Sequence, residues 1–157
     1  MTMTTAQPDL LAGVEPADAL SVMALGTTVI QGAGDVLFKL GDRAEHVYLI
    51  LRGRVSLTLP ITVGDAEQDI FIEERQTGQT LGWSALIPPC RFTLKATTPL
   101  ETELLALPRG PLLEYFTARP EVGYLVSLNL ATVIGQRLQV VQAMWLREMQ
   151  RLVNAHA

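Results

Sequence analysis

The segment Leu81 to Ala96, LGWSALIPPCRFTLKA, contains the residue types that hold a small anion. Gly82 lets the backbone approach a ligand closely, and the free N–H groups at the start of a helical turn point toward negative charge. The guanidinium of Arg91 can fork onto the oxygens of a phosphate. Because the bulky indole of Trp83 stands in the middle of this loop, the sequence also raises the question of whether a ligand fits.

The sequence lacks most of the residues that metal sites, iron–sulfur clusters and catalytic sites require. An iron–sulfur cluster needs several cysteines, and the chain has one, Cys90. A haem would need an axial ligand such as His46, which stands at a turn-to-strand position typical of surface residues. A cupin-type metal site needs several converging ligands, and the two histidines, His46 and His156, are widely separated. No nucleophile–base pairing or glycine-rich triphosphate loop is recognisable. We therefore expect no metal site and no enzyme, and we keep a redox sensor based on Cys90 beside Arg91 as an alternative.

Composition and charge narrow the class of protein. With 157 residues, 48% hydrophobic and 18% charged, the chain suits one globular domain. Its net charge is −4, and the densest basic run, Arg137 to Arg151, is interleaved with apolar residues. A duplex-binding domain needs clustered cations, so we expect no direct binding of nucleic acid.

The cellular setting follows from what the sequence lacks. A single cysteine excludes an internal disulfide and indicates a reducing compartment. The N-terminal stretch MTMTTAQPDL resembles no signal peptide, and no run reaches the roughly 18 apolar residues that span a bilayer. We expect a cytoplasmic protein of bacterial type that does not contact membranes.

The hydrophobic period changes along the chain. Residues 8–26 contain Glu15-Pro16 and a stop at Gly26, which predicts one or two short helices. Residues 27–107 contain short strand-like runs separated by Gly-Asp and other glycine turns, a pattern typical of an antiparallel sandwich or barrel. The runs are VLFKL at 36–40, VYLIL at 47–51, VSLTL at 55–59, DIFIE at 69–73 and TELLAL at 102–107.

Residues 108–157 are predicted to be helical. Pro108 ends the strand-like pattern, Pro111 suits a first helical turn, and no proline interrupts residues 121–153. Apolar residues recur there at spacings of three and four, as in a coiled coil. This seam consists of Ala131, Ile134, Leu138, Val141, Trp145 and Met149. A second apolar face consists of Leu130, Val133, Val140 and Met144. One face can pack on the chain's own barrel while the other takes a partner, so we expect a homodimer; in the alternative, the seam packs only on the barrel.

The order of these elements resembles the cyclic nucleotide-binding domain family. AGDVLFKLGDRAEHVYLILRGRVSL at 33–57 looks like the family's signature of two Gly-Asp turns followed by two strands. PEVGYLVSLNLATVIGQRLQVVQ at 120–142 resembles the dimer helix of the catabolite-activator branch. The resemblance covers about residues 10–150. It implies one sensor domain over residues 1–157, mainly β with flanking helices: a double-stranded β-helix (jelly roll) with a long C-terminal dimerisation helix.

In that family, the loop equivalent to residues 81–96 binds the cyclic phosphate. By resemblance, Gly82 and Arg91 match the family's glycine and its phosphate-binding arginine, within one position for Arg91. Trp83 stands where the family has a ribose-binding glutamate, and an indole offers one donor and no acceptor. The predicted ligand-binding set is Gly82, Trp83, Ser84, Ala85, Arg91, Phe92, Thr93 and, on the long helix, Gln142.

Three interpretations of the loop stay open. Cyclic AMP or cyclic GMP binds as effector with Arg91 on the phosphate; another small anion binds; or Trp83 fills the pocket and the domain serves dimerisation or protein docking. Transcription factors of this family continue beyond the long helix into a winged helix-turn-helix, whereas this sequence stops at Ala157. We therefore expect a stand-alone regulatory domain that signals in trans through an unknown protein partner.

Overall fold

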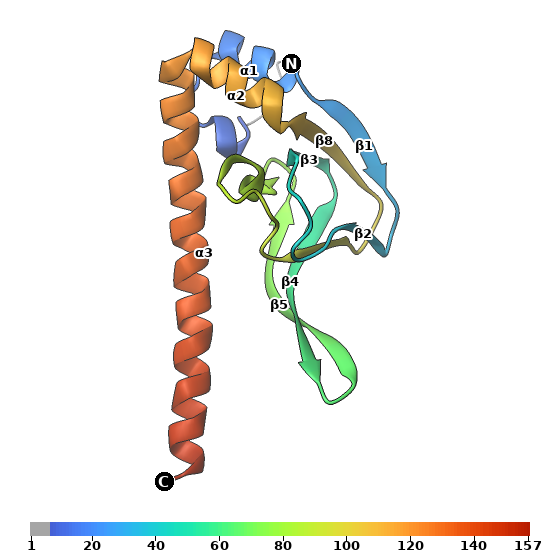
Figure 1. The fold of residues 1–157 in the computed structure, drawn as a ribbon, viewed down its shortest axis with the longest axis vertical. Coiled ribbons are helices and arrows are strands. Elements are labelled where there is room, and N and C mark those ends of the chain that lie inside the picture. The colour runs from blue at the N-terminus through green and yellow to red at the C-terminus, as the bar shows by residue number, and fades with distance from the viewer. Residues whose placement is uncertain (1–6) are drawn as a thin grey trace, which may run out of the picture.

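Glycine turns divide the centre of the chain into short strands, which pair into two four-stranded antiparallel sheets (Figure 1). The computed structural model describes residues 7–157. The strands are β1 (Thr27–Gln31), β2 (Asp35–Phe38), β3 (His46–Arg52), β4 (Arg54–Val63), β5 (Ala66–Gln76), β6 (Thr80–Leu81), β7 (Lys95–Thr98) and β8 (Thr102–Pro108). One sheet has the order β1-β8-β3-β6 and the other β2-β7-β4-β5. The predicted mainly-β jelly-roll fold is confirmed.

Helices cover one end and one side of the two sheets. They are η1 (Asp9–Leu11), α1 (Pro16–Met23), η2 (Trp83–Leu86), α2 (Arg109–Ala118) and α3 (Pro120–Ala155). A proline lies in the first turn of α1 and of α3, where its missing N–H leaves no hydrogen bond unmade. The predicted long helix is confirmed: α3 has 36 residues and runs past the sheets to the C-terminus (Figure 1).

The core lies between the two sheets and continues under the helices. Its largest fully buried side chains are Leu11, Val22, Val47, Ile50, Val55, Leu57, Leu81, Leu104, Leu107, Leu112 and Val126. Helix α3 contributes Val122, Val126 and Leu130, which are spaced by four residues and so lie on one face. These three anchor only the N-terminal third of α3.

The strands differ from the prediction in two ways. The five predicted runs correspond to β2, β3, β4, β5 and β8, whereas β1, β6 and β7 were missed because they are short or polar. Strands β4 and β5 have 10 and 11 residues and form a hairpin that projects beyond the rest of the sheet (Figure 1). Pairing with a neighbouring strand, not the local sequence, therefore decides the extent of these elements.

Candidate functional site

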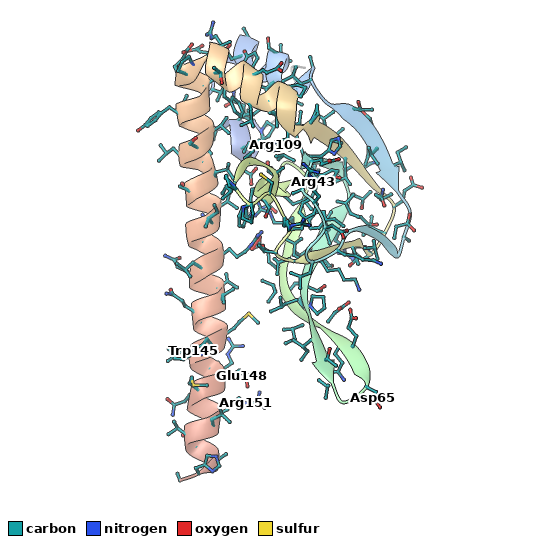
Figure 2. All side chains as sticks on the ribbon, in the orientation of Figure 1. Arg43, Asp65, Arg109, Trp145, Glu148 and Arg151 are labelled. Atoms are coloured by element: carbon teal, nitrogen blue, oxygen red, sulfur yellow. The ribbon has the colours of Figure 1, made fainter. Side chains whose placement is uncertain are left out.

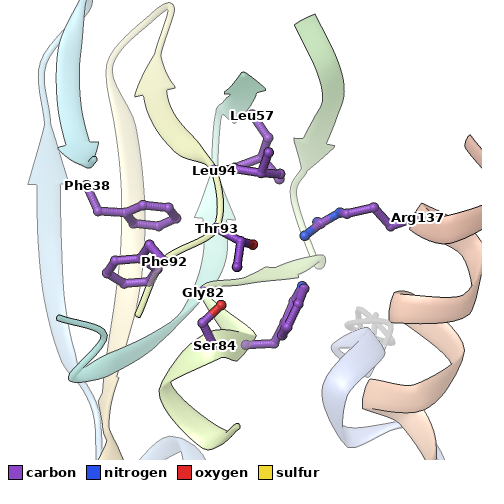
Figure 3. Close-up of a pocket in the computed structure, with 9 residues that line it drawn as sticks. Phe38, Leu57, Gly82, Ser84, Phe92, Thr93, Leu94 and Arg137 are labelled. Carbon is purple, nitrogen blue, oxygen red and sulfur yellow. The ribbon is translucent and has the colours of Figure 1, made fainter. Parts of the chain in front are cut away.

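A small pocket lies where the loop after β6 passes under α3 (Figure 3). Its free volume is about 10 Å³, which is room for roughly one water molecule. The lining residues come from β2, β4, the loop over residues 82–94 and α3. They are Phe38, Leu57, Gly82, Trp83, Ser84, Phe92, Thr93, Leu94 and Arg137.

Gly82 sets the path of this loop. It is buried and has a φ of +77°, in the left-handed region that favours glycine. A Cβ atom at this position would lie 3.1 Å from the carbonyl oxygen of His46 and 3.2 Å from Cδ2 of Tyr48. The chain can therefore turn into η2 against β3 only because residue 82 has no side chain.

Gly82→Ala is expected to destabilise the fold by at least about 2 kcal/mol, because backbone strain and overpacking add. Gly78→Ala is the matched control: its φ is +85°, but a Cβ there would meet nothing within 4 Å. We expect about 1 kcal/mol for the control, from strain alone. Urea unfolding of both variants measures the difference. Equal losses of stability would contradict the close packing around Gly82.

Aromatic side chains fill the barrel side of the pocket. The rings of Phe38 and Phe92 are stacked, with centroids 3.6 Å apart and planes at 6° (Figure 3). The ring of Tyr48 stacks on Phe38 with centroids 6.2 Å apart. Both phenylalanines are buried. This wall of the pocket is therefore apolar and carries no charge.

Arg137 closes the pocket from the side of α3. Figure 3 shows its side chain reaching from the helix toward the pocket. Its guanidinium carbon lies 5.5 Å from the centre of the Trp83 ring, a cation–π contact. Its Nη2 donates to Oε1 of Glu73 at 3.1 Å, and its Nε is buried without a hydrogen-bond partner. The contacts of Arg137 with Trp83 and Glu73 thus hold the arginine and tryptophan side chains against each other at this side of the pocket.

Glu73 belongs to an ionic network that joins three parts of the fold. Its Oε1 also lies 3.5 Å from Nη1 of Arg75, whose side chain is 8% exposed. Arg75 donates from Nη2 to Oδ2 of Asp9 at 2.6 Å and from Nε to the carbonyl of Thr80 at 3.0 Å. The hydroxyl of Thr80 donates to the other carboxylate oxygen of Asp9 at 2.6 Å. Charged groups on η1, β5 and α3 are therefore held together with little access to water.

The structure brings together part of the predicted ligand-binding set. Five members line the pocket: Gly82, Trp83, Ser84, Phe92 and Thr93. Ala85 is buried in the core, and Gln142 is exposed on α3 and does not line the pocket. The lining arginine is Arg137, which the sequence showed only as part of the helix string Arg137 to Val140. Nothing in its spacing marked it as a pocket residue.

Arg91 does not line the pocket. It is exposed, pairs with Arg43 in an isolated β-bridge, and donates from Nη1 to the carbonyl of Gly41 at 3.0 Å. Successive side chains of an extended segment point to opposite sides, so an inward Phe92 places Arg91 outward. In this arrangement Arg91 lies outside the pocket, and its role toward a phosphate stays a prediction.

The family model of the cyclic nucleotide-binding domain matches residues 32–119. The chain belongs to the cyclic nucleotide-binding domain family. That match covers β2 to β8 and all of α2 but not β1 or α3, and the family is one of regulatory domains. The resemblance to this family that the sequence indicated is therefore confirmed.

Solved structures of regulators are similar to this cyclic nucleotide-binding domain. The N-terminal domain of a transcriptional regulator from Streptomyces coelicolor is 26% identical, with a TM-score of 0.68 over 82% of this chain and 89% of that one. The catabolite activator protein of Thermus thermophilus is 25% identical, with a TM-score of 0.71 over 87% of this chain and 61% of that one. The sensor domain of the transcriptional regulator DNR from Pseudomonas aeruginosa, 16% identical with a TM-score of 0.66 over 83% and 86%, shares the fold. A search of curated proteins finds no match.

The pocket of this cyclic nucleotide-binding domain, as arranged, is much smaller than a usual ligand pocket. Ligand pockets usually measure about 300–1,000 Å³, against about 10 Å³ here. An indole stands where the resemblance implies a ribose-binding carboxylate, and Arg91 points away.

A second, open groove lies on the other side of the loop and measures about 580 Å³. It is lined by Arg43, Ala44, Glu45, His46, Pro88, Pro89, Cys90, Pro108, Arg109 and Gly110. Cys90 is half-buried there with a φ of +58°. Within residues 7–157, no three His, Cys, Asp or Glu side chains are grouped to hold a metal ion. None of the helices described is both long and apolar enough to cross a membrane.

Tyr48, beside Gly82, makes alkaline stability a test of this packing. Burial raises the pKa of its phenol above the ordinary value of 10.0. The folded chain then keeps this proton to higher pH than the unfolded chain does. The contribution of the protonated phenol to the free energy of unfolding is therefore full below pH 10 and is lost as pH rises further. Between pH 9 and about pH 11, the free energy of unfolding measured in urea is expected to fall less for Tyr48→Phe than for the unmodified protein. Identical alkaline slopes would contradict the buried phenol.

Proposed function

We propose that this cyclic nucleotide-binding domain is a homodimeric regulatory module that pairs through α3 and acts on a protein partner. In this proposal its pocket is closed by its own Trp83 and Arg137. The observation that carries the proposal is the exposed apolar surface of α3 beyond residue 131. We set aside an enzyme because the family is one of regulatory domains. We set aside a nucleic-acid-binding protein because the net charge is −4.

The predicted seam supports dimerisation because the chain's own barrel leaves it uncovered. Leu138, Val141 and Trp145 are 56%, 42% and 62% exposed. Contiguous apolar surface of this kind marks a protein interface. A parallel arrangement, with a two-fold axis along the helices, places each seam residue against its own copy, as in a coiled coil.

The regulatory role is supported by the relatives, whose names describe a transcriptional regulator and the sensor domain of another. The pocket supports a role that needs no bound nucleotide. Its mouth is held by the pairing of Arg137 with Glu73 and by the contact of Arg137 with Trp83. Opening it would break a charged hydrogen bond that is largely shielded from water.

Two measurements on the whole chain test this function. Sedimentation equilibrium is expected to show a dimer at about 10 µM, the range in which an interface of ordinary size is populated. A monomer at that concentration would contradict dimerisation.

Calorimetric titration with cyclic AMP and with cyclic GMP is expected to give no binding heat, and millimolar nucleotide no thermal shift. Binding heat would mean that the pocket opens, which would restore the nucleotide-sensor interpretation. In that event, Arg91→Ala and Arg137→Ala would show which arginine holds the phosphate, because loss of a charged hydrogen-bond partner costs about 1.5–3 kcal/mol.

A further inference from the structure

We propose that the β4–β5 hairpin of one subunit packs its apolar face on α3 of the second copy, beside Leu146 and Val153. This rests on the dimer proposed above and adds a second contact to it. By two-fold symmetry the contact occurs twice, once for each hairpin.

The outer part of the hairpin has no support from its own sheet. β4 pairs with β7 only at Ser56, Leu57 and Thr58, whereas its pairing with β5 continues to Val63 opposite Ala66. Residues 59–70 therefore form a two-stranded ribbon outside the sandwich (Figure 1). An isolated two-stranded ribbon is at best marginally stable in water, so it needs a surface to pack on.

The two faces of this ribbon differ in polarity. Leu59 lies opposite Ile70 and Val63 opposite Ala66, and with Ile61 they share one face. The exposed fractions of Leu59, Ile70 and Val63 are 36%, 37% and 51%. The other face carries Thr62, Glu67 and Asp69, the last paired with Lys95 at 2.9 Å, and nearer the sheet Pro60 and Phe71, which is 57% exposed. The face with Leu59, Ile61 and Val63 is the one without a charged side chain, so covering it desolvates no charge.

The α3 seam by itself is too small for a stable dimer. A fully exposed apolar side chain of this size buries roughly 60–120 Å². The six seam residues, of which Ile134 and Met149 are only partly exposed, then supply at most roughly 350 Å² per subunit, against about 800 Å² in a stable interface. Further apolar surface would have to be covered in the dimer. Among the exposed apolar residues, the ribbon face and the pair Leu146 and Val153, which are 63% and 64% exposed, lie on or beside the C-terminal turns of α3.

The two-fold arrangement brings these two surfaces to the same place. At 3.6 residues per turn, Leu146 and Val153 lie roughly 90° around α3 from the seam. They lie roughly opposite the face that Val122 and Val126 pack on the barrel. A two-fold axis through the seam puts the second copy's barrel and hairpin on that side.

The hairpin also reaches the correct level along the helix. Figure 2 shows Asp65, at the hairpin tip, level with Arg151 near the end of α3. Rotation about an axis parallel to α3 leaves this level unchanged. The hairpin of the second copy therefore reaches the turns of α3 that carry Leu146 and Val153.

Cross-linking of two tagged chains, both carrying Cys90→Ser, tests the contact. One chain carries Asp65→Cys and the other Gln150→Cys, which lies beside Leu146 and Val153 on the face proposed for the second copy; both residues are exposed. A short bis-maleimide is expected to join the two chains. Arg151→Cys, one residue further and pointing toward the chain's own hairpin, is the matched control and is expected to give at most a tenth as much product between chains.

The outcomes separate this contact from the dimer itself. Leu138→Cys chains that link to each other, without a product between Asp65→Cys and Gln150→Cys, would overturn the hairpin contact and leave the seam standing. If neither pair links, the dimer fails and the hairpin contact with it. A product formed only when both cysteines are in one chain would show that the hairpin folds onto its own α3, which also overturns the proposal.

A second pair of variants tests the two faces of the ribbon. Val63→Asn, on the apolar face, is expected to weaken dimerisation roughly fivefold to tenfold in sedimentation equilibrium. Thr62→Asn, on the polar face of the same strand, is expected to change it less than about twofold. Both sites are exposed in the single chain, so neither change should unfold it. Equal dissociation constants for the two variants would overturn the proposal.

Discussion

Trp145→Asp is expected to convert the proposed dimer into a monomer. The indole is 62% exposed in the single chain and lies in the middle of the seam, between Val141 and Met149. In the proposed dimer Trp145 meets its own copy, and large central aromatic residues carry most of the energy of an interface. Two buried carboxylates at that position would also repel. We expect a loss of at least about 3 kcal/mol, which is more than a hundredfold in the dissociation constant.

Sedimentation velocity at about 10 µM measures this change directly, in the range where a specific dimer is populated. Gln139→Asp is the matched control, because Gln139 is exposed and lies about 120° around the helix from Trp145. The control is expected to stay dimeric. Thermal unfolding of the barrel should be unchanged in both variants once the protein concentration is accounted for, since exposed side chains contribute little to the single fold. A dimeric Trp145→Asp variant would rule out the α3 seam.

Glu73→Gln is expected to give the largest loss of stability near the pocket, about 2–4 kcal/mol. The change keeps the shape of the side chain but removes the charge shared by Arg75 and Arg137. Their side chains are 8% and 12% exposed, so both guanidinium groups would be left with poor access to water. Removing one partner of a buried ionic network is costly because the remaining charges stay desolvated.

Urea unfolding measures this loss, with Glu101→Gln as the control. Glu101 pairs with Arg52 at 3.2 Å, but its side chain is 63% exposed, and such surface pairs contribute at most about 1 kcal/mol. In chains that carry Trp145→Phe, the fluorescence of Trp83 reports whether Arg137 has left the pocket. An unchanged stability together with an unchanged Trp83 spectrum would show that Glu73 does not hold α3 on the barrel.

Local sequence accounts for much of the barrel. Strands β3, β4 and β8 alternate or run apolar between glycine turns, so their burial pattern follows from the residue order alone. β6 has two residues and β7 reads KATT, which carry no strand signal of their own. Each forms because a neighbouring strand already presents unpaired N–H and C=O groups, which a linear pattern cannot show.

In the loop after β6, the sequence likewise predicted some residue positions but not others. Gly82 and Trp83 could be placed at a pocket from their order in the chain, because the turn conformation is local. The direction of Arg91 could not, since it depends on the bridge between Arg91 and Arg43 and on the stacking of Phe92 against Phe38. A difference of one residue along an extended segment moves a side chain from the inside to the outside.

By itself, therefore, the sequence determined the fold, the family, the turn at Gly82 and the long helix. Only the tertiary structure decided what closes the pocket, because Glu73, Trp83 and Arg137 come from β5, η2 and α3 and meet only when the chain packs. The tertiary structure also decided which apolar residues of α3 the chain's own barrel leaves uncovered. Fully buried residues of α3 end at Leu130, and contact with the barrel continues to Arg137, whereas Leu138, Val141 and Trp145 are exposed because the sheets end before the helix does.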